Sequence, residues 1–457
     1  MFDKNKLAEN LRICARISFA LMLILIPFRL RTVAIAHPRL GIFGDYTDFL
    51  FYAMDVGLLA LVIFWILSLM LKPRRLFLGP IAVGFPLAGL LASAVISLIT
   101  SIDPLLTFYL LIRYGLLLVL YLFIINELFS AVWFAVPAAI GVLLQSVIAV
   151  AQSLTQQDVK LQWLGEYSLD PTAPFISILE VNGTRFLRAY GLSDHPNILG
   201  GFLAFGMVIL LSVVVARVGK SWVKMMAAFV FVCGSAGLFT TYSRSAWAAL
   251  VAGCLLIFVG VTYQRNWRGL LSAFVLIVIC AMAVSPLILI TREYTAARFD
   301  VNDSFSNNRV ERGSVVERLY LFVQAYRILE QNPWTGVGLG ASVIAMQDHY
   351  PVFKMSYQPP HVSILAAAME LGYSGAVFYA ALMALPFYMA FRGCRYWQDI
   401  KVITAFALIL SMMIVGLFDH YLWTLVPGRI MQWLAWGIFG AAVTRLETPN
   451  HQNESGA

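Results

Sequence analysis

Hydrophobic runs of about 20 residues recur along almost the whole chain, and they limit its fold more than any other feature of the sequence. A helix of about 20 apolar residues crosses the hydrocarbon core of a lipid bilayer. The 457 residues are 60% hydrophobic and only 12% charged, which is too little charge to cover a soluble protein of this size. The sequence therefore predicts an all-α polytopic integral membrane protein. About twelve transmembrane helices are expected, at residues 13–30, 48–71, 78–99, 104–126, 129–153, 197–217, 222–240, 245–262, 269–291, 362–391, 400–418 and 423–444.

Basic residues in the short connections set the predicted orientation, because cytoplasmic loops carry an excess of lysine and arginine. One set of alternating connections is rich in these residues, as in "KPRR" at 72–75 and in the stretches 217–224, 265–268 and 392–401. The opposite set holds far fewer, so both termini are expected to be cytoplasmic. The first hydrophobic run lacks a small-residue cleavage site, and it is therefore predicted to be an anchor and not a cleaved signal peptide.

This orientation places two long connections on the face opposite the cytoplasm. The expected segments are helices one to five in 1–153, a loop in 154–196, helices six to nine in 197–291, a large loop in 292–361, and helices ten to twelve with a tail in 362–457. Within the large loop, residues 314–333 carry apolar side chains at helical spacing, which predicts an amphipathic helix on the membrane surface. The "PWTGVGLG" that follows is typical of a turn. No strand precedes it and no GK[ST] follows it, so nucleotide binding is not expected.

Charge and cysteine usage exclude several function classes. The formal charge is +8, but the basic residues are scattered among apolar helices, so lipid head groups are favoured over nucleic acid as partners. The five cysteines lie far apart, which matches neither a disulfide framework nor a zinc motif. The pairs "DH" at 348–349 and 419–420 lack a third ligand at a recognisable spacing. We therefore expect no metal and no cofactor.

Polar residues beside predicted helix ends are the candidates for chemistry on the outer face. His361 follows two prolines and precedes an apolar run, so it is expected at the start of a helix. Arg188, Arg244 and Arg318 are predicted near other ends on the same face. Guanidinium groups match phosphate oxygens in pairs, and a histidine, with an ordinary pKa of about 6.5, can accept a proton from a hydroxyl group. Together these residues indicate displacement of a diphosphate by an alcohol.

Several neighbouring residues are supporting candidates, although each also has a simpler structural explanation. Asp194, His195 and Asn197 in "SDHPN" are typical of a helix start, so helix capping is favoured over proton transfer. Arg312 has the position of an arginine that extends its charge to the membrane interface. A cluster of such arginines that only anchors the protein to lipid is a further alternative.

Two charged residues fall inside predicted membrane helices. Glu370 lies two and a half turns beyond His361, on nearly the opposite side of an ideal helix, and it is kept as a supporting candidate. Arg113 lies in the middle of a predicted span, where a charge needs a buried partner or a cavity, and the sequence does not identify that partner.

In these residues the chain resembles the O-antigen ligase/polymerase family of bacterial envelope glycosyltransferases. The likeness lies in "RAYGLSDHPN" at 188–197, "SRSAW" at 243–247, Arg318 before "PWTGVGLG", and the pattern H........E.G..G from His361 to Gly375. It implies a GT-C-like architecture with a large periplasmic loop between helices nine and ten, and a metal-independent reaction. By the same likeness Arg244 and Arg318 would hold a diphosphate, with Arg188 as a further member, and His361 would activate the acceptor. Val362 stands where the family often has asparagine.

The resemblance implies an O-antigen ligase of the bacterial inner membrane. Such an enzyme would transfer O-polysaccharide from undecaprenyl diphosphate to the lipid A–core oligosaccharide at the periplasmic face, with inversion at the anomeric carbon. An O-antigen polymerase or a protein O-oligosaccharyltransferase of the same family is the nearest alternative, because the acceptor differs while the donor does not. A lipid-linked glycan transporter is the alternative from another class. Transporters place charges near the membrane midplane, and here Arg113 is the main residue of that kind.

Overall fold

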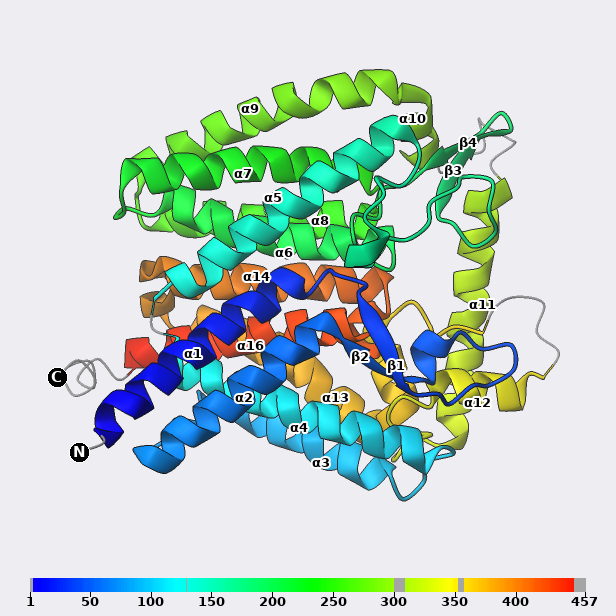
Figure 1. The fold of residues 1–457 in the computed structure, drawn as a ribbon, viewed down its shortest axis with the longest axis horizontal. Coiled ribbons are helices and arrows are strands. Elements are labelled where there is room, and N and C mark those ends of the chain that lie inside the picture. Colours follow the sequence, from blue (N-terminus) through cyan, green and yellow to red (C-terminus); the bar gives the residue numbers. More distant parts are fainter. Residues whose placement is uncertain (1–2, 129, 300–308, 352–356, 448–457) are drawn as a thin grey trace.

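The computed structural model describes residues 3–128, 130–299, 309–351 and 357–447, and within these ranges it is built almost entirely from helices. Figure 1 shows the long helices lying alongside one another. Nine helices of the described ranges are long and apolar enough to cross a bilayer. They are α2 (Ala53–Leu71), α4 (Pro104–Glu127), α5 (Val132–Thr155), α6 (Pro196–Val215), α7 (Ser221–Thr240), α8 (Arg244–Tyr263), α9 (Trp267–Ile290), α13 (Ser363–Arg392) and α14 (Ile400–Phe418). The predicted all-α polytopic class is confirmed.

The other three predicted runs also contain helices, namely α1 (Lys4–Leu25), α3 (Ile81–Ser97) and α16 (Val426–Glu447). Helix α1 begins well before residue 13 because the side chain of Asp3 caps it, accepting hydrogen bonds from two main-chain N–H groups. Helix α3 is shorter than a typical span. Each of the twelve predicted runs therefore corresponds to a helix, although three of these helices lack the length or the uniform hydrophobicity of the nine.

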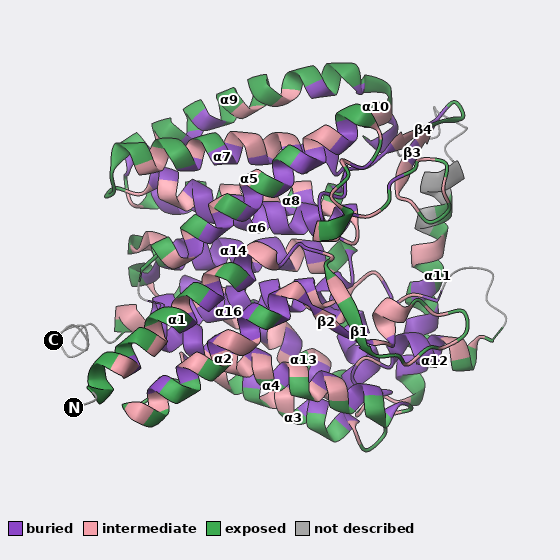
Figure 2. Cartoon of the chain, in the orientation of Figure 1, coloured by how far each residue is buried: buried purple, intermediate pink, exposed green. Residues whose placement is uncertain are grey.

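The most buried and one of the most exposed of the long helices show which part of the bundle is internal and which part faces lipid. Nearly every residue of α6 is buried, which makes it a central helix of the bundle. Helix α9 instead exposes large apolar side chains along much of its length, and it is largely green at the edge of the molecule in Figure 2. An exposed apolar surface of this extent is stable in contact with lipid and not with water. Helix α9 is thus a lipid-facing helix.

The buried Arg113 of α4 has a partner in the neighbouring helix α2. Its guanidinium donates to both carboxylate oxygens of Asp55, at 2.6 and 3.1 Å. The two residues lie 58 positions apart in the sequence, so local spacing could not reveal the pair. A buried charge at this depth is tolerated because its partner neutralises it.

The strands, most of the short helices and one longer helix gather at one end of the bundle, on the right in Figure 1, while both termini lie at the other end. The strands form two antiparallel hairpins with Arg31 paired to Tyr52 and Ile178 paired to Leu187. These elements are β1 (Arg31–Ile35), η1 (Gly44–Tyr46), β2 (Phe49–Tyr52), η2 (Gln162–Leu164), β3 (Ile178–Val181), β4 (Thr184–Leu187), α10 (Arg292–Phe299), α11 (Arg309–Gln331), α12 (Ser342–His349) and α15 (Tyr421–Thr424). The remaining short helix, η3 (Cys394–Gln398), joins α13 to α14.

Helix α11 contains most of the amphipathic helix predicted at 314–333, and it runs across the ends of the long helices in Figure 1. Leu321, Ala325 and Ile328 recur at helical spacing and are fully buried. They pack in one cluster with residues of α12 and α13. Helix α11 is therefore anchored to the bundle through this face.

A break in α13 holds the glycine-rich turn against the bundle. Gly372 has a φ of 72°, and a Cβ there would lie 2.3 Å from the main chain of Trp334. The main-chain N–H of Tyr373 donates to the carbonyl of Pro333 at this point. Glycine is needed because both the left-handed conformation and the close approach exclude a side chain. The turn at 333–340 thus serves packing, which agrees with its prediction as a turn.

Candidate functional site

His361 lies directly before α13, as its position after two prolines predicts. It meets the link between α14 and α15, where Asp419 and His420 lie. Its Nδ1 is 3.8 Å from Asp419 Oδ1, and its ring centroid is 4.8 Å from that of His420. This nitrogen is buried and has no hydrogen-bond partner among the described residues. The sequence analysis missed both neighbours as members of the site.

A series of contacts connects His361 to Arg188 through Asp419 and Asn197, and the two links beyond Asp419 are hydrogen bonds. Asn197, in the first turn of α6, donates to Asp419 Oδ2 at 2.7 Å and accepts from the Arg188 guanidinium at 2.6 Å. Burial by itself would raise the pKa of the Asp419 carboxyl, but its interactions with His361, His420 and Arg318 hold that pKa well below the usual range. Asp419 is therefore a carboxylate at any working pH, and it lies where it can stabilise a protonated His361.

The other two histidines nearby have structural partners. His195 caps α6, its Nδ1 accepting from the N–H of Asn197 at 3.1 Å, so the prediction of capping is confirmed. His420 Nδ1 lies 2.7 Å from Thr424 Oγ1. Burial, with smaller contributions from neighbouring positive charges, lowers the pKa of each histidine to about 3. Both are therefore weak bases near pH 7, which leaves His361 as the candidate proton acceptor.

Four arginines from four separate segments crowd together next to this group. Arg188 precedes α6, Arg244 is the first residue of α8, Arg298 lies in the last turn of α10 and Arg318 lies on α11. Burial, and then the charges of the other three arginines, lower the pKa of Arg298. Burial likewise lowers the pKa of Arg188 to about 10, with Arg318 and Arg244 contributing. The structure thus brings the three predicted arginines together and adds a fourth, Arg298, that sequence reasoning missed.

The described contacts of these arginines go largely to neutral oxygens. Arg188 donates to the carbonyl of Thr241 at 2.8 Å and to Ser177 Oγ at 2.9 Å. Arg298 donates to the carbonyl of Tyr242 at 3.0 Å. The buried Nε of Arg318 has no hydrogen-bond partner among the described residues. A group of guanidiniums held this close together suits a polyanionic ligand such as a diphosphate.

An apolar groove begins beside the arginine cluster. It has a volume of about 310 Å³ and is lined by Ser235, Leu238, Phe239, Trp247, Leu250, Val284, Ile288, Thr295 and Phe299. Trp247 lies one turn beyond Arg244 in α8, and Phe299 directly follows Arg298. The groove lies among α7, α8, α9 and α10, and α9 is the lipid-facing helix. The cluster and the groove together suit a ligand with an anionic head and a hydrocarbon tail.

Three of the supporting candidates lie elsewhere or cannot be placed. Asp194 is paired with Arg31 at 2.7 Å and Arg29 at 3.1 Å, and burial raises its pKa to about 6 despite these partners. Glu370 is fully buried and accepts hydrogen bonds from neutral donors, the N–H of Gly340, Ser342 Oγ and Trp423 Nε1. It therefore holds the glycine-rich turn onto α13. The side chain of Arg312 lies outside the described residues.

His361, Asp419 and His420 also suit a metal ion chemically, because two imidazoles and one carboxylate are a common ligand set. Their ligand atoms lie within 4.8 Å of one another. The sequence offered no third ligand for the "DH" pair, whereas the fold supplies His361. Two features favour proton transfer instead. Asp419 Oδ2 is already engaged by Asn197, and the charge of Arg318 acts on both Asp419 and His420 and opposes a second cation.

Comparison with protein-family models gives a match. The family model described as O-antigen ligase matches residues 229–380. This stretch contains three of the clustered arginines, the apolar groove and His361, whereas Arg188, Asn197 and Asp419 lie outside it. No curated protein matches the chain.

Proposed function

The chain belongs to the O-antigen ligase family, and from that premise we propose that it transfers an O-polysaccharide from undecaprenyl diphosphate to the lipid A–core oligosaccharide. The family implies a glycosyltransferase-like enzyme of the ligase or polymerase kind, and the apolar helices make it an integral membrane protein. The proposed location is the bacterial inner membrane, with both termini in the cytoplasm and the site facing the periplasm.

One observation carries the proposal most strongly, the connection from the arginine cluster to His361. Arg188, Asn197, Asp419 and His361 form a continuous series of contacts, although Asn197 and Asp419 lie 222 positions apart. A diphosphate held by the arginines would therefore lie beside a potential proton acceptor. The apolar groove next to Arg244 would receive the polyprenyl tail.

The proposed reaction is a single displacement. The acceptor hydroxyl oxygen forms a bond to the anomeric carbon, and the bond from that carbon to the diphosphate oxygen breaks on the opposite side. The hydroxyl proton goes to His361, and Asp419 stabilises the imidazolium that results. The leaving diphosphate takes the electron pair, and the preorganised arginine charges stabilise it. This course inverts the configuration at the anomeric carbon.

Alternative functions differ in what they require of the same site. A polymerase or a protein O-oligosaccharyltransferase would use the same donor machinery with another acceptor. The structure gives the transporter alternative less support than the sequence did, since Arg113, the charge near the midplane, is neutralised by Asp55. The arrangement of base and arginines favours transfer over transport.

The test is transfer by purified protein in detergent with EDTA, using lipid-linked polysaccharide as donor and lipid A–core as acceptor. Wild type is expected to form ligated product, and a folded His361→Ala protein is expected to form none above background. His349→Ala is the matched control, because His349 lies on α12 and bonds to Ala345 and Gln331. Lengthened donor chains without ligation would indicate a polymerase. Loss of activity on chelation, restored by a divalent metal, would replace the proton acceptor with a metal site.

A further inference from the structure

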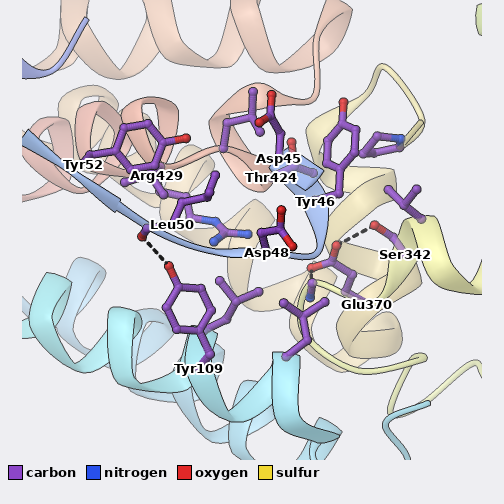
Figure 3. A pocket seen from close by; sticks show the side chains of 17 residues that line it. Asp45, Tyr46, Asp48, Leu50, Tyr52, Tyr109, Ser342, Glu370, Thr424 and Arg429 are labelled. Carbon is purple, nitrogen blue, oxygen red and sulfur yellow. Dashed lines mark hydrogen bonds between the residues drawn. The ribbon is translucent and has the colours of Figure 1, made fainter. Parts of the chain in front are cut away.

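A second polar region adjoins His420, separate from the arginine cluster. Figure 3 shows part of it, with Asp45, Tyr46, Asp48 and Thr424 around a small inner cavity. Thr424 bonds His420, and the ring of Tyr46 lies 6.1 Å from the His420 ring. The cavity has a volume of about 30 Å³, which is room for ordered water and not for a sugar. It extends the site toward the β1–β2 hairpin.

A larger groove adjoins the inner cavity. Asp45, Asp48 and Leu50 line both. The groove has a volume of about 400 Å³, within the range of small-molecule sites. Its other walls come from the start of the hairpin and from the 154–196 loop, and they include the exposed residues Val33 and Gln162. A ligand of sugar size therefore fits the groove.

The charge balance of the groove differs from that of the arginine cluster. Its two guanidiniums are already paired, Arg31 with Asp45 and Asp194, and Arg29 with Asp194. Two carboxylates, Asp45 and Asp48, stand against these two guanidiniums in the groove lining, so the lining has no net charge. Carboxylate oxygens accept hydrogen bonds from sugar hydroxyls and repel phosphate. The lining suits an uncharged sugar.

We propose that this groove is the acceptor subsite and that it binds an uncharged, hydroxyl-rich sugar residue. Asp48 and the exposed part of Asp45 accept hydrogen bonds from its hydroxyls. The identity of this sugar as the acceptor rests on the proposed function, but the binding of sugar in the groove does not. The groove thereby selects an acceptor whose bound sugar residue carries no phosphate. The arginine cluster selects the phosphorylated donor.

The test uses two groove variants and one control in the full-length protein. Val33→Trp fills the groove, and the fold should tolerate it because the Val33 side chain is half exposed on the hairpin. In the wild type, the main-chain N–H of His37 donates a hydrogen bond to Asp48 Oδ1 at 2.7 Å. Asp48→Asn keeps an oxygen for this hydrogen bond and removes the negative charge. Asp170→Asn is the control, because it removes an exposed carboxylate from the 154–196 loop at a position that does not line the groove. Each is compared for initial rates over a range of acceptor and of donor concentrations.

Binding is measured as well as turnover. The probe is a deacylated, dephosphorylated core oligosaccharide titrated into each purified protein by calorimetry. The KM for acceptor should rise about tenfold in Asp48→Asn and more in Val33→Trp, with the donor KM unchanged and the control like wild type. Oligosaccharide binding should weaken in the same order. Unchanged acceptor KM and unchanged binding in Val33→Trp would overturn the inference.

The two proposals fail separately in this design. If wild type transfers no glycan but binds the oligosaccharide, and Val33→Trp abolishes that binding, the groove inference stands and the proposed function fails. If wild type ligates normally and all variants behave alike, the function stands and the groove inference fails. A phosphorylated oligosaccharide that binds more tightly than the dephosphorylated one would also contradict the inference.

Discussion

The two ends of this protein use arginine in opposite ways. At the end where both termini lie, Arg12, Arg16 and Arg74 converge on the fully buried carboxylate of Glu127. The indole N–H of Trp65 donates to the same carboxylate at 2.8 Å. Here a carboxylate saturated with donors ties α1, α2 and α4 together, and the arginines have a structural role.

At the end that carries the loops, arginines crowd one another instead. Arg188 bonds three neutral oxygens, from Thr241, Ser177 and Asn197. Keeping buried charges close together is costly unless something of opposite sign joins them. The comparison teaches that arginines gathered on one buried carboxylate indicate a structural role, whereas arginines that crowd one another beside a potential proton acceptor indicate a ligand site. One nearby carboxylate, Asp419, faces the histidines and Asn197.

The largest expected effect is on the transfer rate, and it distinguishes the buried carboxylate of Asp419 from that of Glu127. Asp419→Asn should lower the transfer rate by about 10²- to 10⁴-fold, because the protonated His361 loses its stabilising charge. The acid limb of the rate profile should also move to lower pH, since the wild-type carboxylate, whose pKa is depressed, is charged throughout and favours the protonated imidazole. Initial rates from pH 5 to 9 measure both. A profile that keeps its position while the rate falls would assign Asp419 a purely structural role.

The converse variant is Glu127→Ala at the other end. It leaves three arginines without their shared partner, and breaking a buried ion pair costs about 3–5 kcal/mol of unfolding free energy. Thermal unfolding in detergent should therefore show a large loss of stability. The rate per folded molecule should match wild type, and a selective loss of donor binding would break the comparison.

Removing one charge from the arginine cluster should have the opposite effect to Glu127→Ala, namely a loss of activity without a loss of stability. Arg318→Gln should reduce transfer by about 10²- to 10³-fold, as loss of one preorganised donor typically does. Its thermal stability should be equal to or above that of wild type, because repulsion with Arg244 and Arg298 falls. Rates and unfolding temperatures are measured on the same preparation. A loss of activity that follows a loss of stability would indicate a structural arginine.

The smallest expected effect is the response to inorganic pyrophosphate. A ligand that binds only the folded state, at a concentration of 100 times its Kd, adds about 2.7 kcal/mol to the free energy of unfolding. Pyrophosphate should raise the unfolding temperature of wild type and of Glu127→Ala, and it should raise that of Arg318→Gln much less. Equal shifts in all three proteins would mean that the anion binds elsewhere.

The sequence predicted what depends on local pattern. Bilayer thickness fixes the length of an apolar run, so all twelve runs correspond to helices. The proline pair placed His361 before a helix, and "SDHPN" gave the cap of α6. These features need only neighbouring residues.

What the sequence could not predict is the meeting of distant segments. Asp419 and His420 are adjacent in the sequence and were recognised as a pair. Their partner His361 lies before a different helix, α13, so the sequence did not indicate the contact. Arg298 had no signal that distinguished it from other loop arginines. Arg113 and Asp55 are matched across two helices, and no spacing rule links them. Tertiary packing decides such contacts.

The most direct test of the central claim is equilibrium binding of labelled undecaprenyl diphosphate in EDTA to wild type, His361→Ala and Arg318→Gln. If the arginines hold the diphosphate and His361 only accepts a proton, His361→Ala will bind the lipid like wild type while transferring no glycan, and Arg318→Gln will bind it at least tenfold more weakly. Binding lost in His361→Ala but kept in Arg318→Gln would contradict the account.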